Sequence, residues 1–297
     1  MSDRRITSAF LFVIPTEVEE SLNISEFKNT ETSRDVSHST RFARSGHALN
    51  MAAAPLRNGC NVTLPLDMTE KQKRLLLFDI DGTLIHSGGA GVEALKVALK
   101  ERFEIADDLH DIEIAGMTDS GIVISILKKH KIPTSAENVA AFLDSYVHFL
   151  SLELPRRKGK LLPGVLELLK RLKTRKHLVL GLLTGNVSRG AQLKLGHYGV
   201  WHFFEFGAFA DDHHDRNELG AFARARAQEK HGREFSADEI DVIGDTPRDI
   251  ACGKALGART IAVATGTWSR QKLAEHDPDI LIDDLSDVDR LINTLGW

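Results

Sequence analysis

From residue 75 onward, apolar and polar positions alternate in a way that predicts strands followed by helices. Short apolar runs, typical of buried strands, lie at 75–78, 177–183, 240–243, 260–264 and 280–282. Between them apolar residues recur every three or four positions, as at Leu95, Leu99 and Phe103, which indicates helices. A shorter aromatic strand is expected near 203–206. This alternation favours an α/β fold with a Rossmann-like, mostly parallel sheet covered on both faces.

One part of the chain interrupts the alternation. Helical patterns at 92–103, 120–131 and 135–152 follow one another with no strand pattern between them. We therefore interpret residues 88–160 as an inserted α-helical cap domain. Residues 71–87 and 161–297 then form the α/β core.

Residues 1–70 differ from the rest of the chain. Serine, threonine, asparagine and charged residues dominate, and apolar positions show no sustained period. Such a composition buries too little apolar area to offset the entropy of ordering. Two interpretations stay open: a disordered leader, or an extension upstream of a native start at Met68.

Composition narrows the class of protein. The 297 residues are 42% hydrophobic and 27% charged, as in an ordinary globular protein, and the formal net charge is −4. That charge gives no reason to expect nucleic acid or an anionic membrane as a partner. No apolar run approaches the roughly 18 residues of a membrane-spanning helix. Cys60 and Cys252 are the only cysteines, so a disulfide framework is not expected and a cytoplasmic location is.

Chemically useful groups follow three of the expected strands. After the strands at 75–78, 177–183 and 240–243 come, respectively, Asp79 and Asp81; Thr184, Gly185 and Asn186; and Asp245 and Asp249. The carboxyl ends of parallel strands meet at one edge of a sheet, so we expect these groups to converge in one crevice. Four acids suit a hard divalent cation such as Mg²⁺, and backbone amides at a helix start suit an anion. Together they favour phosphoryl transfer.

The three segments resemble the signature motifs of the haloacid dehalogenase superfamily of hydrolases. They are Asp79-Ile80-Asp81-Gly82-Thr83, Thr184-Gly185-Asn186 and Gly244-Asp245-Thr246-Pro247-Arg248-Asp249. Their order and spacing match, and the resemblance covers residues 74–297. The helical insert and the segment 162–169 also resemble phosphoglycolate phosphatase-like members.

The resemblance implies a role for each residue. Asp79 is the expected nucleophile that forms an aspartyl-phosphate, and Asp81 is the expected general acid and base. The implied Mg²⁺ ligands are Asp79, Asp81 through its backbone carbonyl, Asp245 and Asp249. The implied phosphate-binding residues are Thr184, Gly185 and Asn186. The superfamily usually has a lysine before its last motif; here the best candidate is Arg216, with a surface ion pair as the alternative.

The resulting prediction is a Mg²⁺-dependent phosphatase, monomeric or homodimeric, acting on a small phosphorylated metabolite such as phosphoglycolate. A phosphomutase of the same superfamily and a non-catalytic phosphate-binding or interaction module remain alternatives. A dehalogenase is disfavoured because it does not need Asp81 or the pair Asp245 and Asp249.

Two further segments have competing interpretations. The acids and histidines at 211–215 could hold a transition metal, although a polar loop beside the active site is favoured because adjacent residues rarely ligate one ion. Residues 116–119 could reach the substrate, or Thr118 could simply cap a helix.

Overall fold

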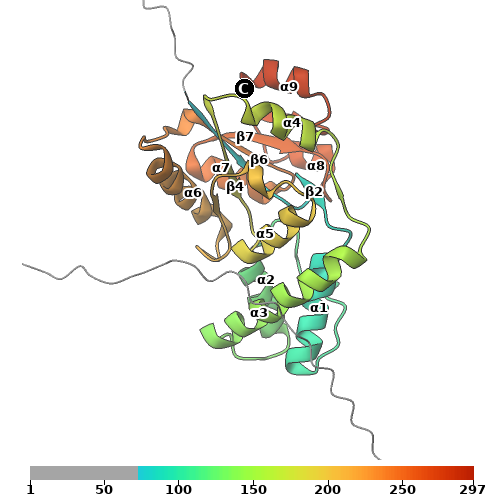
Figure 1. Cartoon of the computed structure of the whole chain (residues 1–297). Coiled ribbons are helices and arrows are strands. Elements are labelled where there is room, and N and C mark those ends of the chain that lie inside the picture. The colour runs from blue at the N-terminus through green and yellow to red at the C-terminus, as the bar shows by residue number, and fades with distance from the viewer. Residues whose placement is uncertain (1–72) are drawn as a thin grey trace, which may run out of the picture. The chain divides into compact units, whose positions relative to one another are not determined.

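The structure, a computed structural model, describes residues 73–297. The predictions on residues 1–70, including the start at Met68, lie outside the described residues. A six-stranded sheet in the order β5-β4-β1-β6-β7-β8 carries the fold, and all its neighbouring strands are parallel (Figure 1). The strands are β1 (Arg74–Phe78), β4 (Leu178–Leu183), β5 (Gly207–Ala208), β6 (Ile240–Gly244), β7 (Arg259–Val263) and β8 (Ile280–Ile282).

Helices cover both faces of the sheet. Side chains of β1 alternate between the faces, so that Leu76 and Phe78 pack into one hydrophobic cluster and Leu75 and Leu77 into another. The first cluster contains α4 (Val165–Lys173), α5 (Ser188–His197) and α9 (Val288–Leu295). The second contains α6 (Arg216–His231) and α7 (Pro247–Leu256), while α8 (Arg270–Ala274) packs beside β8. Short 3-10 helices lie at Leu154–Arg156, Trp201–Phe203 and Ala237–Glu239.

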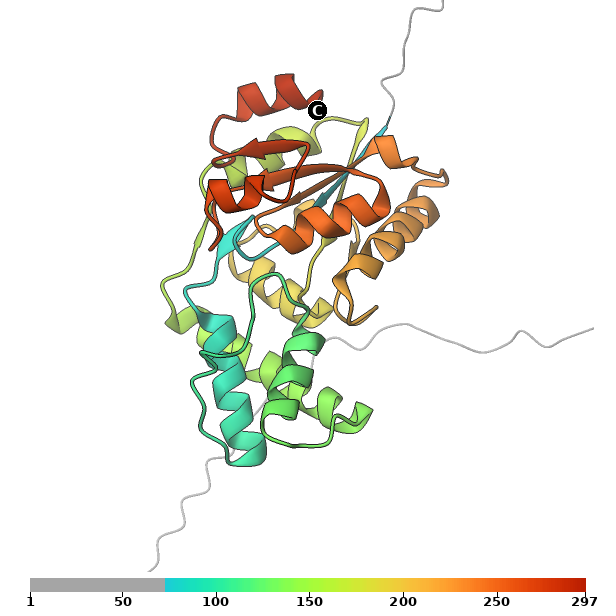
Figure 2. The same cartoon turned by 180° about the vertical axis from the view of Figure 1, so that it is seen from behind.

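Three helices lie between β2 (Ile85–His86) and β3 (Lys160–Leu161), which pair antiparallel in a small second sheet. They are α1 (Ala90–Phe103), α2 (Asp119–Lys129) and α3 (Ala136–Glu153). Their apolar side chains form a third hydrophobic cluster, which also takes in Val187 and Ala210. Figure 2 shows the three helices grouped beyond one edge of the sheet.

The expected α/β fold with a mostly parallel sheet and an α-helical insert is confirmed. The boundaries proposed for the cap, 88–160, stay a prediction. Within residues 73–297, no helix combines the length and the apolar character that crossing a membrane requires.

The aromatic strand expected near 203–206 is wrong in position, because β5 is the two-residue segment Gly207–Ala208. Phe203 instead ends a 3-10 helix, and its ring is buried in the core. The chain reaches the edge of β4 only at Glu205, whose amide donates to the Leu180 carbonyl at 3.1 Å. Burial of one aromatic ring therefore outweighs the strand preference of the aromatic run.

Candidate active site

The three motif segments meet at the carboxyl end of the sheet, as the parallel topology requires. Asp79 follows β1, Thr184 follows β4 and Asp245 follows β6. These strands are neighbours, with β1 between the other two. A cavity of about 410 Å³ lies here, and both Asp79 and Asp245 line it together with Asp81.

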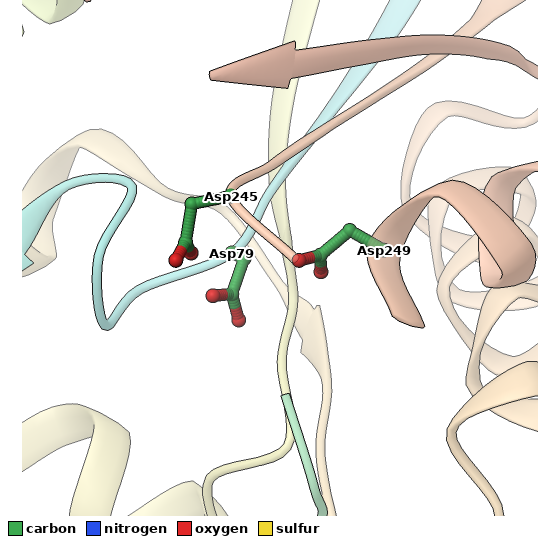
Figure 3. Close-up of side chains that lie close together, drawn as sticks. All are labelled: Asp79, Asp245 and Asp249. Atoms are coloured by element: carbon green, nitrogen blue, oxygen red, sulfur yellow. The ribbon is translucent and has the colours of Figure 1, made fainter. Parts of the chain in front are cut away.

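Three carboxylates form the floor of the site. Asp79, Asp245 and Asp249 each place an oxygen within 4.8 Å of the others, and all three side chains are buried (Figure 3). The Thr83 hydroxyl donates to Oδ1 of Asp245 at 3.1 Å. Gly82 has a φ of +86°, and a Cβ there would lie 2.3 Å from Oδ2 of Asp245. Only glycine therefore lets the turn after β1 approach this carboxylate.

Burial makes this acid group electrostatically unfavourable. Desolvation raises the pKa of Asp79 to about 6, with further contributions from the charges of Asp249 and Asp81, while Arg216 opposes the shift. Desolvation and the same kind of repulsion raise the pKa of Asp245 well above its usual value. Three ionised carboxylates beside one guanidinium leave an excess of two negative charges. Such an oxygen-rich, negatively charged group fits Mg²⁺.

Arg216 is the cation beside these acids. Its Nη2 lies 2.8 Å from Oδ1 of Asp79, and it also pairs with Asp249. Its Nη1 donates to the Gly116 carbonyl, in the segment before α2, at 3.1 Å. Asp215 caps α6 by accepting from the Asn217 amide, which places Arg216 at the first position of that helix. Arg216 is therefore a buried residue of the site, and the alternative of a surface ion pair is wrong.

Asp81 has partners of its own. Its Oδ2 accepts from Nδ2 of Asn186 at 3.0 Å and from Nζ of Lys194 at 2.6 Å. Nζ of Lys194 also donates to Oδ1 of Asn186 at 2.6 Å, and this lysine is only 4% exposed. The charges of Asp81 and Asp119 raise the pKa of Lys194 against the desolvation that would lower it.

Sequence reasoning missed Lys194. It lies on α5 between Ala191 and Leu195, both completely buried, so its position on the helix predicts a buried side chain. A lysine on the buried face of the helix that follows an expected anion-binding turn is the signal that could have found it.

The second motif contributes unequally to the cavity. Gly185 and Asn186 line it, whereas Thr184 is completely buried and is not among the lining residues. The Thr184 hydroxyl accepts from Nδ2 of Asn186 at 2.8 Å. A Cβ on Gly185 would lie 2.1 Å from the carbonyl oxygen of Met117, so glycine is required where this turn meets the insert.

Residues 116–119 both cap a helix and reach the cavity. The Thr118 hydroxyl accepts from the Gly121 amide at 3.1 Å and so caps α2, as one interpretation expected. Gly116, Met117 and Asp119 line the cavity. The Asp119 amide donates to the Gly185 carbonyl at 2.6 Å, and desolvation raises the pKa of the Asp119 carboxyl to about 6.

The acids of the loop 211–215 have structural partners. Asp212 pairs with Arg226 at 2.6 Å, Asp211 accepts from the Ser188 amide at 2.5 Å and Asp215 caps α6. These contacts support the interpretation of this segment as a polar loop.

Comparison with known proteins identifies the family. Residues 76–263 match the model of the haloacid dehalogenase-like hydrolases. The chain belongs to this family. The resemblance seen in the three motifs is thereby confirmed, and the chain is a hydrolase.

Individual relatives are more distant. The chain is 28% identical over 221 residues to a curated protein of Dickeya dadantii named "probable phosphatase IndB", covering 73% of this chain and 92% of that protein. A crystal structure from Haemophilus somnus, described as a "predicted phosphoglycolate phosphatase", is 21% identical with a TM-score of 0.57 and covers 74% and 98% of the two chains. Crystalline CbbY from Rhodobacter sphaeroides, in complex with phosphate, is 15% identical with a TM-score of 0.60 and covers 73% and 96%. These two structures share the fold.

Proposed function

We propose that this hydrolase is a Mg²⁺-dependent phosphatase that cleaves a small phosphorylated metabolite through an aspartyl-phosphate. The observation that carries the proposal is the position of Asp79, which is buried on the cavity floor between a cation and two further acids. A carboxylate held in this way cannot diffuse away from a bound phosphate, so it is positioned to attack. The relative named as a phosphatase supports the same class.

In the proposed reaction, an oxygen of Asp79 attacks phosphorus while the bond to the ester oxygen breaks. Asp81 gives its proton to the leaving alcohol and later takes one from the water that hydrolyses the aspartyl-phosphate. Lys194 and Asn186 hold one oxygen of Asp81 and so orient this carboxyl group.

Charge on the transferred phosphoryl group needs compensation. Arg216 and the backbone around Gly185 and Asn186 are the proposed phosphate contacts, with Thr184 supporting Asn186 from behind. Asp79, Asp245, Asp249 and the Asp81 carbonyl are the proposed Mg²⁺ ligands. When bound, the ion would supply positive charge to the phosphoryl oxygens.

The helical insert is the proposed cap. Its residues 116–119 contact the turn after β4, so movement of the insert would open or close the cavity that contains Asp79. Closure would exclude bulk water during the reaction. Phosphoglycolate is the first substrate to test, since the cap resembles that of phosphoglycolate phosphatase-like proteins and one structural relative carries that description.

The test is release of phosphate from p-nitrophenyl phosphate and phosphoglycolate with Mg²⁺, repeated in EDTA. Asp79→Asn should lower kcat at least about a thousandfold. Asp144→Asn, which changes an exposed acid paired with Arg189 on α3 and α5, is the matched control. Wild-type turnover in Asp79→Asn, or in EDTA, would remove the proposed mechanism. A sugar-phosphate isomer in place of free phosphate would indicate a phosphomutase.

A further inference from the structure

The cavity has an ionic floor and an apolar wall. The floor consists of the groups described above. The wall belongs to the insert and consists of Val92, Leu95, Ile114, Met117, Ile122 and Tyr146. These side chains come from α1, α2, α3 and the segment between α1 and α2. A group attached to the phosphate and directed away from the floor would contact this wall.

Lys194, one of the cations lining the cavity, already has a full set of partners. An ammonium group has three N–H donors. Nζ of Lys194 contacts Oδ2 of Asp81 and Oδ1 of Asn186, each at 2.6 Å, and bonds to the Tyr146 hydroxyl. No donor of this lysine is left for a second anionic group of a substrate.

Arg216, the other cation, belongs to the floor. It pairs with Asp79 and Asp249 and donates to the Gly116 carbonyl. Lys194 and Arg216 are the only lysine and arginine among the described residues that line the cavity. His86 is exposed, and its Nδ1 accepts from the Gly88 amide at 3.2 Å. The charged residue that the insert adds is an acid, Asp119.

From this arrangement we infer that the site selects phosphate monoesters with an uncharged, largely apolar leaving group, such as an alkyl or aryl alcohol. It discriminates against esters that carry a second anionic group, including phosphoglycolate. The inference rests on the proposed phosphatase function and narrows its substrate class.

Two physical effects act in the same direction. A carboxylate against the wall would lose hydration without gaining a cation, and the Asp119 carboxylate would repel it. An alkyl or aryl group would instead remove apolar surface from water on both sides of the contact. A volume of about 410 Å³ falls in the range of pockets that hold organic ligands, so space is available for such a group.

The experiment compares substrates matched in shape. Isobutyl phosphate is the uncharged isostere of phosphoglycolate, and phenyl phosphate is compared with 4-carboxyphenyl phosphate. In the second pair the carboxylate makes the better leaving group, so intrinsic reactivity opposes the expected order. We expect kcat/KM, measured by phosphate release with Mg²⁺, to favour the uncharged member of each pair at least about tenfold. Equal values, or a preference for the carboxylated esters, would overturn the inference.

A charge inserted in the wall gives a second readout. Val92→Lys places a cation on α1 at the cavity, whereas Val97→Lys places one on the same helix at a residue that does not line it. The kcat/KM ratio of isobutyl phosphate to phosphoglycolate should fall at least about fivefold in Val92→Lys and stay unchanged in Val97→Lys. An unchanged ratio in folded Val92→Lys would count against the inference. If the wild-type protein hydrolyses none of the esters, the proposed function itself fails, which differs from hydrolysis in the opposite order.

Discussion

Lys194 and Asp81 form a buried ion pair, with Nζ 2.6 Å from Oδ2, although 113 positions separate them in the chain. The lysine belongs to the core helix α5, and the aspartate to the turn after β1. Because Asn186 contacts both residues, the pair fixes the second motif to the first. We therefore regard Lys194 as a positioning residue for Asp81.

Replacement of Lys194 should impair the proton-transfer step. In Lys194→Met the apolar stem is retained, but Asp81 loses its cation, so we expect kcat to fall about 10- to 100-fold. Without the ammonium group Asp81 should also hold its proton to higher pH, so the acidic limb of the kcat–pH profile should move upward. Steady-state kinetics across pH would measure both. Lys170→Met on α4, at an exposed position, is the control, and an unaltered profile in Lys194→Met would exclude a positioning role.

Arg216 should not be replaceable by lysine without loss. One guanidinium contacts Asp79, Asp249 and the Gly116 carbonyl, which a single ammonium on a shorter reach cannot all do. Arg216→Lys keeps the charge, so we expect a folded protein whose kcat/KM falls about tenfold or more. Thermal unfolding and kinetics on the same preparation would separate the effects. Wild-type kcat/KM in this variant would show that charge alone suffices.

The approach of residue 116 to the core offers a test of how the insert closes. Gly116 has a φ of +72°, and a Cβ there would lie 2.6 Å from Oγ1 of Thr246. Gly199 has a similar φ of +73°, but a Cβ there would meet nothing within 4 Å. Both alanine variants carry the same backbone strain, of about 1 kcal/mol. Only Gly116→Ala should lower kcat/KM, by about tenfold, and equal activities of the two variants would contradict the proposed closure.

The sequence predicted the parts of the site that lie on strand ends. Asp79, Asp245 and Asn186 follow apolar runs whose pairing is set by parallel topology, so their convergence could be expected before any coordinates. Arg216 could be proposed only from the family resemblance. Lys194 and Asp119 could not be placed in the site, because their roles depend on how the insert packs against α5. That packing is a tertiary relationship, and no local period encodes it.

The raised pKa of Asp79 predicts a pH-dependent cost to stability in the metal-free protein. A carboxyl whose pKa is about 6 when folded and about 4 when unfolded binds more protons in the folded state between these values. Stability therefore falls as pH rises from about 4 through 6. At pH 7.5 in EDTA, Asp79→Asn should exceed the wild type by roughly 1 to 3 kcal/mol, after allowing for its lost contact with Arg216.

Urea unfolding at pH 4 and pH 7.5 would measure this difference. It should shrink at pH 4, where the wild-type carboxyl is protonated in the folded state. Added Mg²⁺ should stabilise the wild type more than Asp79→Asn, because binding to the folded state raises its stability. A difference that is independent of both pH and Mg²⁺ would show that Asp79 carries no such cost.

The opposite sign is expected at Asp241, on β6 and away from the proposed active site. Burial would raise the pKa of this carboxyl, but donors from Arg259, Arg74 and Trp297 outweigh it and lower the pKa. The Trp297 indole donates to Oδ2 at 2.7 Å, and Arg259 contacts both carboxylate oxygens at 2.8 Å. The Asp241 side chain is fully buried, so this group connects the sheet to the C-terminal residue.

Asp241→Asn should destabilise the protein by about 3 kcal/mol at pH 7, because the arginines lose their buried counter-charge. An acid with a lowered folded pKa stabilises above its unfolded value near 4, and this stabilisation is lost as pH falls through the folded pKa. The gap between wild type and Asp241→Asn in urea unfolding should therefore narrow below about pH 4. Asp283→Asn removes an exposed partner of Arg270 and should cost less than about 1 kcal/mol at either pH. A gap of constant size from pH 7 to pH 3 would show that shape, and not the charge of Asp241, holds Trp297 in place.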